Sequence, residues 1–510
     1  MNRFDRREFL KTSLAAGLVS SLGVLRGVGA GESVGANDRI NAAVIGIHGQ
    51  GGGHIGNFLG MQKDNVELIA ICDVDQKVLG QRADEIEKKA GKRPQTYVDL
   101  RKLFENKDVH VVSTATPNHW HSLVVVWGCQ AGKDVYVEKP CSHNVFEGRM
   151  AVEAARKYGR IVQHGTQRRA GNEGAKIAEI ARKGTFGKLL VSRGLCYKSR
   201  GSIGFKPTEA PPKGLDFNLW LGPAPDQPYH ANLVHYNWHW FWDSGCGDIG
   251  NQGVHEIDAA RWAIPGATLP KSVLSVGGRY GYKDQGQTPN TQIAIFDYGE
   301  TQLIFEVRGL KTDKLHDQGI GNVYHFEQGY IAGGKFFRKG SEKPEDLPRV
   351  DVPGKPGGGI FGNFIAAVRS RKREDLCADI LEGHYSSALC HLANISYRLG
   401  KVEPLNPKTK ALGDNKEAYE TLARMDEHLK VNYEALAKSQ EEKRAKDAKY
   451  APKPDELVGD ELKFDGLKLR VGRKLEFDPE KEKFVNDAEA DKLLTRVYRK
   501  PFEVPEKEKL

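Results

Sequence analysis

The sequence predicts an α/β fold joined to an α+β fold: an N-terminal doubly wound parallel sheet, then a C-terminal domain on a largely antiparallel open sheet. Two observations carry this prediction. Between residues 40 and 164, short apolar runs alternate with helical segments, which is typical of parallel strands joined by helices. Between residues 271 and 308, three strand-like runs follow one another, and Tyr298-Gly299-Glu300 joins the last two as a hairpin.

The first predicted strand, residues 40–47, leads into a glycine-rich turn, Gly46-Ile47-His48-Gly49-Gln50-Gly51. A helix is expected from about Gly53. Such a turn lets backbone approach a pyrophosphate, and the helix N-terminus offers free amides and a positive dipole end. His48 replaces the middle glycine of the usual pattern, so the turn is a variant. We predict a dinucleotide site in a Rossmann-type sheet, with contacts from Gly46, His48, Gly49, Gln50 and Gly51.

The second strand, residues 66–72, ends at Asp73. An acidic side chain at this place accepts hydrogen bonds from the adenosine ribose hydroxyls, whereas a 2′-phosphate meets its negative charge. The predicted cofactor is therefore NAD rather than NADP.

Polar motifs follow the later strands of this sheet. Strand 109–115 precedes Thr116 and a helix from about residue 121, and strand 134–137 precedes Glu138-Lys139-Pro140, whose Lys-Pro peptide we expect to be trans. A helix over 144–157 and a strand over 160–164 complete the alternation. Ligands of doubly wound sheets bind at the carboxyl ends of the strands. The side chains expected beside the nicotinamide half of the cofactor are Thr116, Asn118, His121, Glu138 and Lys139.

The pattern changes after Gly165. A helix is expected over 174–183, a strand over 188–197 and an irregular Gly/Pro-rich stretch to about 228. Strands over 271–280, 291–298 and 301–308 and helices over 358–370 and 379–399 follow. From residue 406 the chain is highly charged, is expected to be largely helical and carries no chemical motif.

Two clusters in this second part carry polar or aromatic groups. Asp248, Asn251, His255 and Asp258 are spaced three, four and three residues apart, which places them on one face if they form one helix. Upstream stand the aromatic residues Tyr236, Trp238 and Trp240, with Trp220 and His235 nearby. Aromatic faces stack on sugar rings, but they also form hydrophobic plugs and oligomer contacts. Both interpretations stay open.

The amino terminus has the layout of a twin-arginine export signal. Arg6-Arg7 precedes an apolar, small-residue run over 12–25, which is too short to span a bilayer alone. Cleavage is expected after Ala30 or Ala36. We therefore expect a periplasmic or extracytoplasmic protein without a stable membrane anchor. Because this pathway moves folded proteins, a cofactor inserted in the cytoplasm would travel with the chain, so a tightly bound NAD is expected.

Composition excludes other classes. The 510 residues are 39% apolar with a net charge of +9, and no basic block or interleaved aromatic stripe indicates a nucleic-acid partner. The seven cysteines have neither a disulfide framework nor metal-ligand spacing. We interpret His119, His121 and His239 as polar cleft residues rather than ligands, and expect no metal.

Taken together, residues 37–401 resemble the Gfo/Idh/MocA oxidoreductases. The resemblance rests on the glycine turn, Asp73, residues 116–121, Glu138-Lys139-Pro140, Gly165-Thr166-Gln167-Arg168 and residues 247–258. It implies reversible oxidation of a sugar or polyol hydroxyl, with hydride passing to the nicotinamide. It also implies a homo-oligomer, with the second-domain sheet as a dimer surface.

By the same resemblance, Lys139 matches the active-site lysine and His255 the catalytic histidine. The family usually has an aspartate four residues before that histidine, where this chain has Asn251, so Asp248 is kept as a substitute proton acceptor. Gln167 joins the expected cofactor contacts. The expected substrate contacts are Lys139, Arg168, Tyr236, Trp238, Trp240, Asn251, His255 and Asp258.

Four segments follow from these observations: a signal over 1–36, an NAD-binding domain over 37–165, a substrate and oligomerisation domain over 166–405, and an extension over 406–510. The leading hypothesis is an exported NAD-dependent oxidoreductase acting on a hydroxyl of a sugar, sugar derivative or glycoside. The first alternative is an NAD-dependent glycosidase that oxidises its substrate transiently and produces no net NADH. The second is a non-catalytic carbohydrate-binding protein.

Overall fold

The computed structural model describes residues 39–341, 343–447 and 449–510 of the chain. The segment expected to direct export, residues 1–36, lies outside the described residues. In the part of the chain that is described, no helix is both long and apolar enough to cross a bilayer.

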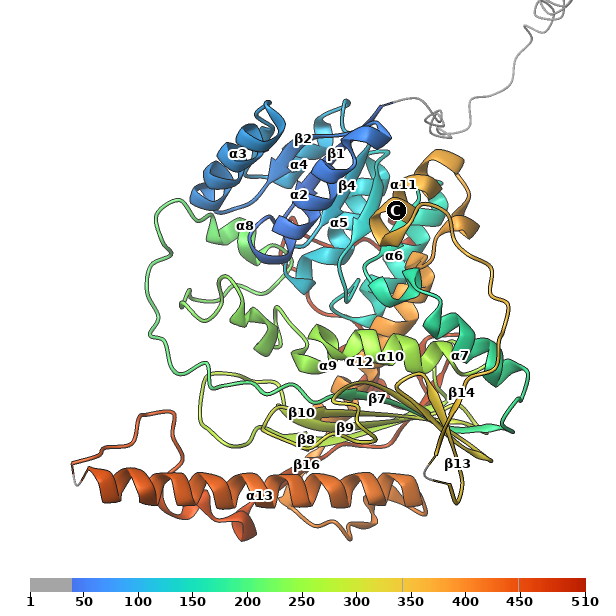
Figure 1. Cartoon of the computed structure of the whole chain (residues 1–510). Coiled ribbons are helices and arrows are strands. Elements are labelled where there is room, and N and C mark those ends of the chain that lie inside the picture. The colour runs from blue at the N-terminus through green and yellow to red at the C-terminus, as the bar shows by residue number, and fades with distance from the viewer. Residues whose placement is uncertain (1–38, 342, 448) are drawn as a thin grey trace, which may run out of the picture. The chain divides into compact units, whose positions relative to one another are not determined.

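The first described sheet is parallel throughout, with the strand order β3-β2-β1-β4-β5-β6 (Figure 1). The expected doubly wound sheet is confirmed, and the strand order reverses between β1 and β4, where such sheets bind ligands. Its strands are β1 (Ile40–Ile45), β2 (Val66–Cys72), β3 (Gln95–Tyr97), β4 (Val111–Thr114), β5 (Asp134–Val137) and β6 (Val162–His164). Its helices are α2 (Gly49–Gly60), α3 (Gln76–Ala90), α4 (Leu100–Glu105), α5 (Asn118–Gln130) and α6 (Val145–Lys157).

Burial explains why the central strands of this sheet are largely apolar. Every residue of β4 and β5 is buried because helices cover both faces of the sheet. Two helices begin earlier than the sequence indicates. The α2 helix starts at Gly49 rather than near residue 53, directly from the glycine turn, and α5 starts at Asn118, directly after Pro117. Both helix N-termini therefore lie immediately beside the carboxyl ends of the strands.

The second described sheet is mixed and mostly antiparallel, with β7 and β10 as its parallel pair. The expected open sheet is confirmed. Helices α10 and α12 pack on one face, in a core shared with β7 and β8 (Figure 1). The strands are β7 (Leu189–Cys196), β8 (Ser272–Gly278), β9 (Thr291–Asp297), β10 (Gln302–Arg308), β11 (Ile320–Phe326), β12 (Gly329–Ala332), β13 (Lys335–Arg338) and β14 (Pro344–Asp346). The helices after β6 are α7 (Glu173–Arg182), α8 (Phe217–Leu221), α9 (Gly247–Asn251), α10 (Gly253–Trp262), α11 (Gly359–Ser370) and α12 (Ile380–Arg398), and of these α11 packs in the core of the first sheet.

The extension is less helical than its charge pattern predicts. After β15 (Lys401–Pro404) and the long helix α13 (Lys416–Lys446), strands β16 (Lys468–Val471) and β17 (Leu475–Asp478) pair with β8 and widen the sheet. The expectation of a largely helical tail was wrong here because alternate side chains of these short strands are buried, which suits a sheet edge. The shorter elements β18 (Lys483–Phe484) and α14 (Ala488–Asp491) follow.

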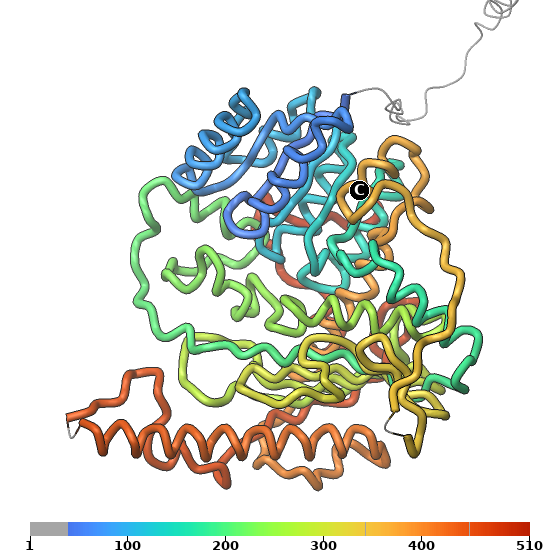
Figure 2. Tube along the Cα trace, in the orientation of Figure 1, coloured from blue at the N-terminus to red at the C-terminus, as the bar shows by residue number. Residues whose placement is uncertain are grey.

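The last residues of the chain return to the parallel-sheet domain (Figure 2). Phe502, Val504 and Leu510 are buried in the core that contains the apolar residues of α5. The Phe502 ring packs edge-on against Trp120. The extension therefore contacts both sheets rather than forming a separate tail.

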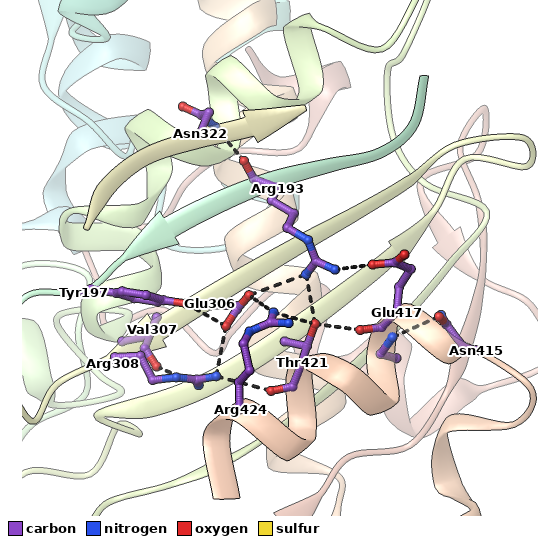
Figure 3. A network of polar contacts seen from close by, with 11 residues as sticks. Arg193, Tyr197, Glu306, Val307, Arg308, Asn322, Asn415, Glu417, Thr421 and Arg424 are labelled. Atoms are coloured by element: carbon purple, nitrogen blue, oxygen red, sulfur yellow. Dashed lines mark hydrogen bonds and ion pairs between the residues drawn. The ribbon is translucent and has the colours of Figure 1, made fainter. Parts of the chain in front are cut away.

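Helix α13 covers the second face of the mixed sheet. Its apolar side packs on side chains of β8, β9 and β10, and a buried charge network crosses the interface (Figure 3). The Glu306 carboxylate on β10 accepts from Arg308 at 2.9 Å, from Arg424 on α13 at 2.9 Å and from the Tyr197 hydroxyl at 2.9 Å. The sheet face that the resemblance implies as a dimer surface is thus occupied within the chain. The homo-oligomer stays a prediction.

Candidate functional site

A cavity of about 460 Å³ lies at the carboxyl ends of β1, β2, β4 and β5. One end is bordered by the glycine turn, and the other by residues that follow the irregular Gly/Pro-rich stretch. The structure brings these sequence-predicted residues together around it: Gly46, His48, Gly49, Gln50, Asp73, Thr116, Asn118, His121, Glu138, Lys139, Tyr236, Trp238 and Asn251.

The glycine turn is packed too closely for side chains at two positions. Gly46 has φ +76°, and a Cβ there would lie 2.7 Å from the Thr116 amide nitrogen. At Gly51 a Cβ would lie 1.9 Å from the Gly46 carbonyl oxygen, so Gly51 supports the turn from beneath instead of lining the cavity. No side chain caps the N-terminus of α2, so its first amides are available to a dinucleotide pyrophosphate.

Asp73 lies at the end of β2 with its carboxylate held by backbone. One oxygen accepts the Ile47 amide at 2.9 Å, and the other accepts the Asp75 amide at 3.0 Å. Burial raises the pKa of Asp73, while these two amides oppose the rise. Each oxygen keeps a second lone pair for a ligand hydroxyl. The turn, the free helix end and Asp73 therefore fit an adenine dinucleotide without a 2′-phosphate.

Glu138, at the end of β5, organises the centre of the cavity from a buried position. Burial alone would raise its pKa, but a hydrogen bond from His54 and the charge of Lys139 lower the pKa of Glu138 to about 2. The same carboxylate accepts from Gln50 at 3.2 Å and from Gln167 at 3.5 Å. Glu138 thus holds neighbouring side chains in place as a fixed anion. Gln167 reaches the site through this bond and does not border the cavity.

Lys139 is fixed at the far end of the cavity. Its Nζ donates to the backbone carbonyl of Asn251 at 2.8 Å, and the Asn251 side-chain amide lies 3.4 Å from the Tyr236 hydroxyl. The Lys139–Pro140 peptide is cis, where the sequence led us to expect trans. These contacts bring a strand end of the first sheet against a helix of the second domain.

The four residues expected on one helix face have different surroundings. Helices α9 and α10 meet at Gln252, whose backbone keeps right-handed helical dihedrals (φ −96°, ψ −46°). Asp248 is buried and bonds to Arg200 at 2.8 and 3.1 Å. Of the four residues, only Asn251 borders the cavity, so they do not present one polar face to it.

The residues on α10 lie behind the cavity. Asp258 is buried between Arg169, at 2.8 Å, and the Ser386 hydroxyl, at 2.7 Å, which places it in a contact with α12 instead of at a ligand surface. His255 is half-buried, and desolvation together with the charge of Lys139 lowers the pKa of His255 to about 3. Its ring is therefore neutral at ordinary pH.

Two further expected substrate contacts also lie away from the cavity lining. Arg168 pairs with Glu256 at 3.1 Å and donates to Asn322 at 2.9 Å. Trp240 is buried, and the Arg200 guanidinium lies 5.2 Å from the centre of its ring. Both side chains stabilise the wall of the site in this arrangement.

The three histidines considered as metal ligands bond to backbone carbonyls instead. His119 pairs with the Trp220 carbonyl at 2.9 Å, His121 with the Pro140 carbonyl at 2.6 Å and His239 with the Tyr236 carbonyl at 2.6 Å. Among the described residues, no group of three His, Cys, Asp or Glu side chains could hold a metal.

Several lining residues were not assigned to the cofactor site from the sequence. Asp99 follows β3, a short exposed strand that the alternation did not reveal, and Lys198 and Gln252 border the other end, 3.3 Å apart. Leu219, Trp220 and His235 come from the irregular stretch and its continuation, where no periodic pattern indicates position. Trp220 and His235 stood out only as an aromatic residue and a histidine, and Leu219 had no signal.

Known protein families match both parts of the chain. Residues 40–166 match the oxidoreductase family model described as an NAD-binding Rossmann fold, and residues 194–432 match the model of the family's C-terminal alpha/beta domain. The chain belongs to the Gfo/Idh/MocA oxidoreductase family. Its first sheet is accordingly the NAD-binding domain of that family, in agreement with the geometry around Gly46 and Asp73.

Relatives and solved structures of this family extend the comparison. A glycosyl hydrolase family 109 protein of Shewanella baltica is 30% identical over 209 residues, 37% of this chain and 45% of the relative. An alpha-N-acetylgalactosaminidase of Shewanella oneidensis is 27% identical over 209 residues, with the same coverage. The match thus spans less than half the length of these curated relatives.

Among solved structures, the WlbA dehydrogenase from Bordetella pertussis, in complex with NADH and UDP-GlcNAcA, superposes with a TM-score of 0.53 at 18% identity. The match covers 71% of this chain and 97% of that one. At this identity the likeness shows the Gfo/Idh/MocA fold.

Proposed function

We propose that this protein is an exported NAD-dependent oxidoreductase that oxidises or reduces a hydroxyl-bearing carbon of a sugar, sugar derivative or glycoside. The observation that carries the proposal is one continuous cavity. Its nucleotide end holds the glycine turn and Asp73, and its other end holds Lys139, Asn251 and Tyr236. A hydride acceptor and a polar substrate would share this space.

The residues at the substrate end have different roles. NAD, when bound, supplies a hydride acceptor at its nicotinamide. The Asn251 carbonyl orients Lys139, which has further N–H donors for a reacting oxygen and so stabilises its alkoxide character. Glu138 beneath it is a fixed anion, because its pKa is about 2. It balances the lysine charge.

We assign proton acceptance to His255 acting together with Lys139, because Lys139 lines the cavity and His255 does not. The histidine ring is neutral, because burial and the charge of Lys139 lower the pKa of His255 to about 3. Asp248, the substitute acceptor, is engaged by Arg200 and is less available. Tyr236 and Trp238 offer the sugar an aromatic surface.

The first experiment determines whether the purified protein carries NAD and which hydroxyl compounds it converts. Protein isolated without added nucleotide is denatured, and the supernatant is analysed by absorbance and mass spectrometry. Stoichiometric NAD, with turnover on a sugar that disappears in Lys139→Met, supports the proposal. A protein that holds no dinucleotide and binds none when NAD or NADP is added would refute it.

A second candidate, the NAD-dependent glycosidase, is favoured by the names of the curated relatives, which are glycosyl hydrolase family 109 proteins. In such a cycle oxidation acidifies a neighbouring C–H, elimination releases the aglycone, and reduction restores the sugar. Release of nitrophenol from nitrophenyl glycosides without net NADH selects this cycle. Net NADH from a free sugar selects the dehydrogenase.

The binding protein remains the third candidate because of Asn251. Sugar binding that persists in Lys139→Ala and His255→Ala, with no turnover in the parent, would select it.

Export is proposed from Arg6-Arg7 and the apolar run that follows. The test fuses residues 1–36 to a reporter that is active only after folded transport. Export that continues after both arginines are changed to lysine would argue against the twin-arginine route. If NAD travels with the folded protein, the enzyme can work outside the cytoplasm with a tightly held cofactor that is reduced and reoxidised in each cycle.

A further inference from the structure

We propose that His235, supplied by the second domain, is a cofactor-binding residue, and that residues 214–239, here the cover segment, close the dinucleotide site so that NAD dissociates slowly. The inference rests on the proposed function only in taking the cavity as the NAD site. It assigns a binding role outside the glycine turn and the parallel strands.

The position of His235 relative to the turn is the first observation. Its imidazole stacks on that of His48, with ring centres 4.3 Å apart and planes 7° apart. His48 is the residue directly before α2, at the uncapped helix end that would bind the pyrophosphate. Both rings border the cavity. His235 therefore stands over the turn that binds the dinucleotide.

A second contact fixes the ring of His235. Its Nε2 lies 3.1 Å from a carboxylate oxygen of Asp75, whose other oxygen caps the N-terminus of α3 at the amides of Lys77 and Val78. Asp75 lies two residues beyond Asp73. The histidine is thus tied to the same loop that presents the ribose-binding carboxylate.

Backbone contacts hold the start of the cover segment to the NAD-binding domain. The Gln76 amide donates to the Gly214 carbonyl at 3.0 Å, and the Asp216 amide donates to the Val74 carbonyl at 2.9 Å. Asp75 and Leu215 form an antiparallel bridge between these bonds. The segment therefore adds a short backbone pairing to the loop after β2.

Helix α8 of the cover segment is attached to α5. The Trp120 indole donates to the carbonyls of Leu219 and Trp220 at 3.1 and 3.0 Å, and His119 pairs with the same Trp220 carbonyl. At Gly222, where φ is +47°, a Cβ would lie 2.2 Å from the Trp120 ring. The packing leaves no room between these elements.

The C-terminal extension secures this attachment. Arg499 donates to the Gly222 carbonyl at 3.0 Å and also contacts Asn218. The cover is consequently attached on both sides of the cavity, at the loop after β2 and at α5. These contacts hold residues 214–222 in place, so release of a dinucleotide depends on opening the contacts of His235. Cover-segment residues that border the cavity are Leu219, Trp220, His235, Tyr236, Trp238 and His239.

The physical consequence concerns release. A dinucleotide bound between the glycine turn and the cover segment can leave only after the His48–His235 stack and the His235–Asp75 bond have opened. Removing the His235 ring removes both contacts without changing Gly46, Asp73 or Lys139. Dissociation should accelerate while hydride-transfer groups stay in place.

The test measures NAD release from the full-length protein. Purified protein is loaded with NAD, mixed with excess 3-acetylpyridine adenine dinucleotide, and sampled by mass spectrometry for retained NAD. We expect His235→Ala to release NAD at least tenfold faster than the parent. His230→Ala changes the same residue type in the same segment, outside the cavity lining, and should release at the parent rate.

A further variant at His235 separates the effect of the ring from that of the bond to Asp75. His235→Phe preserves a ring against His48 but loses the bond to Asp75, so an intermediate release rate is expected, and this variant decides the question if His235→Ala does not fold. Release from folded His235→Ala or His235→Phe at the parent rate overturns the inference while NAD binding stands. A parent that neither carries nor takes up NAD overturns the proposed function as well, which distinguishes the two failures.

Discussion

Replacing Glu306 by glutamine should destabilise the protein by removing the central anion beneath α13 (Figure 3). The carboxylate is fully buried and faces Arg193, Arg308 and Arg424. Arg193 and Arg308 are themselves buried. Arg193 keeps a second partner in Glu417, but Arg308 has no other carboxylate partner within the described residues.

The magnitude follows from that unpaired cation. Breaking a buried ion pair by removing one partner costs about 3–5 kcal/mol, because the remaining charge stays desolvated. We therefore expect the folding equilibrium constant of Glu306→Gln to fall by roughly two to more than three orders of magnitude. The double variant Glu306→Gln with Arg308→Met should recover part of this loss, since it removes the stranded charge.

The assay is urea unfolding followed by tryptophan fluorescence, with midpoints compared at equal slope. Glu300→Gln provides the matched control: Glu300 pairs with Lys188 at 3.0 Å, but both side chains are exposed, so its loss should cost less than about 1 kcal/mol. A Glu306→Gln midpoint within about 1 kcal/mol of the parent would refute the reasoning, as would a double variant no more stable than the single one.

Three further predictions concern the cofactor site, acid stability and the chain end. Asp73→Ser should weaken NAD binding about tenfold and reduce the preference for NAD over NADP, because it removes the ribose acceptor and its charge. Titration with both nucleotides checks this, and an unchanged ratio of the two affinities contradicts it. Burial alone would raise the pKa of Asp258, but Arg169 and Arg261 hold this pKa below the ordinary value. The stability that Asp258 contributes is therefore present above about pH 4 and is lost as pH falls through the pKa of Asp258 in the folded protein. Acid unfolding profiles should therefore be less steep in Asp258→Asn than in the parent, and identical slopes would count against this role. Deleting residues 485–510 should lower the thermal midpoint, because burial of Phe502 alone contributes about 1.5–3 kcal/mol; an unchanged midpoint would show that the segment adds no stability.

The nucleotide end of the site could be read from the sequence because it is local. The glycine turn, the strand before it and Asp73 lie in one strand-turn-helix-strand unit, and the positions of its parts follow from parallel-sheet geometry. The same holds for Glu138 and Lys139, which directly follow β5. Apolar alternation also revealed the hairpin of β9 and β10.

The substrate end depended on contacts between distant segments. Helical spacing predicted that Asp248, Asn251, His255 and Asp258 would face the ligand together, but ion pairs with Arg200 and Arg169 engage Asp248 and Asp258. In a sequence, a charged residue that forms an ion pair within the protein cannot be distinguished from one that binds a ligand.

The sequence by itself determined the doubly wound sheet, the antiparallel domain and the dinucleotide turn, because each depends on short-range periodicity or on residues adjacent in the chain. Only the tertiary structure decided that α13 covers the mixed sheet, that the chain end packs on α5, and that His235 stacks on His48. These contacts join segments far apart in the chain. Their energies come from buried charge pairs and shape-matched packing, which composition and spacing do not record.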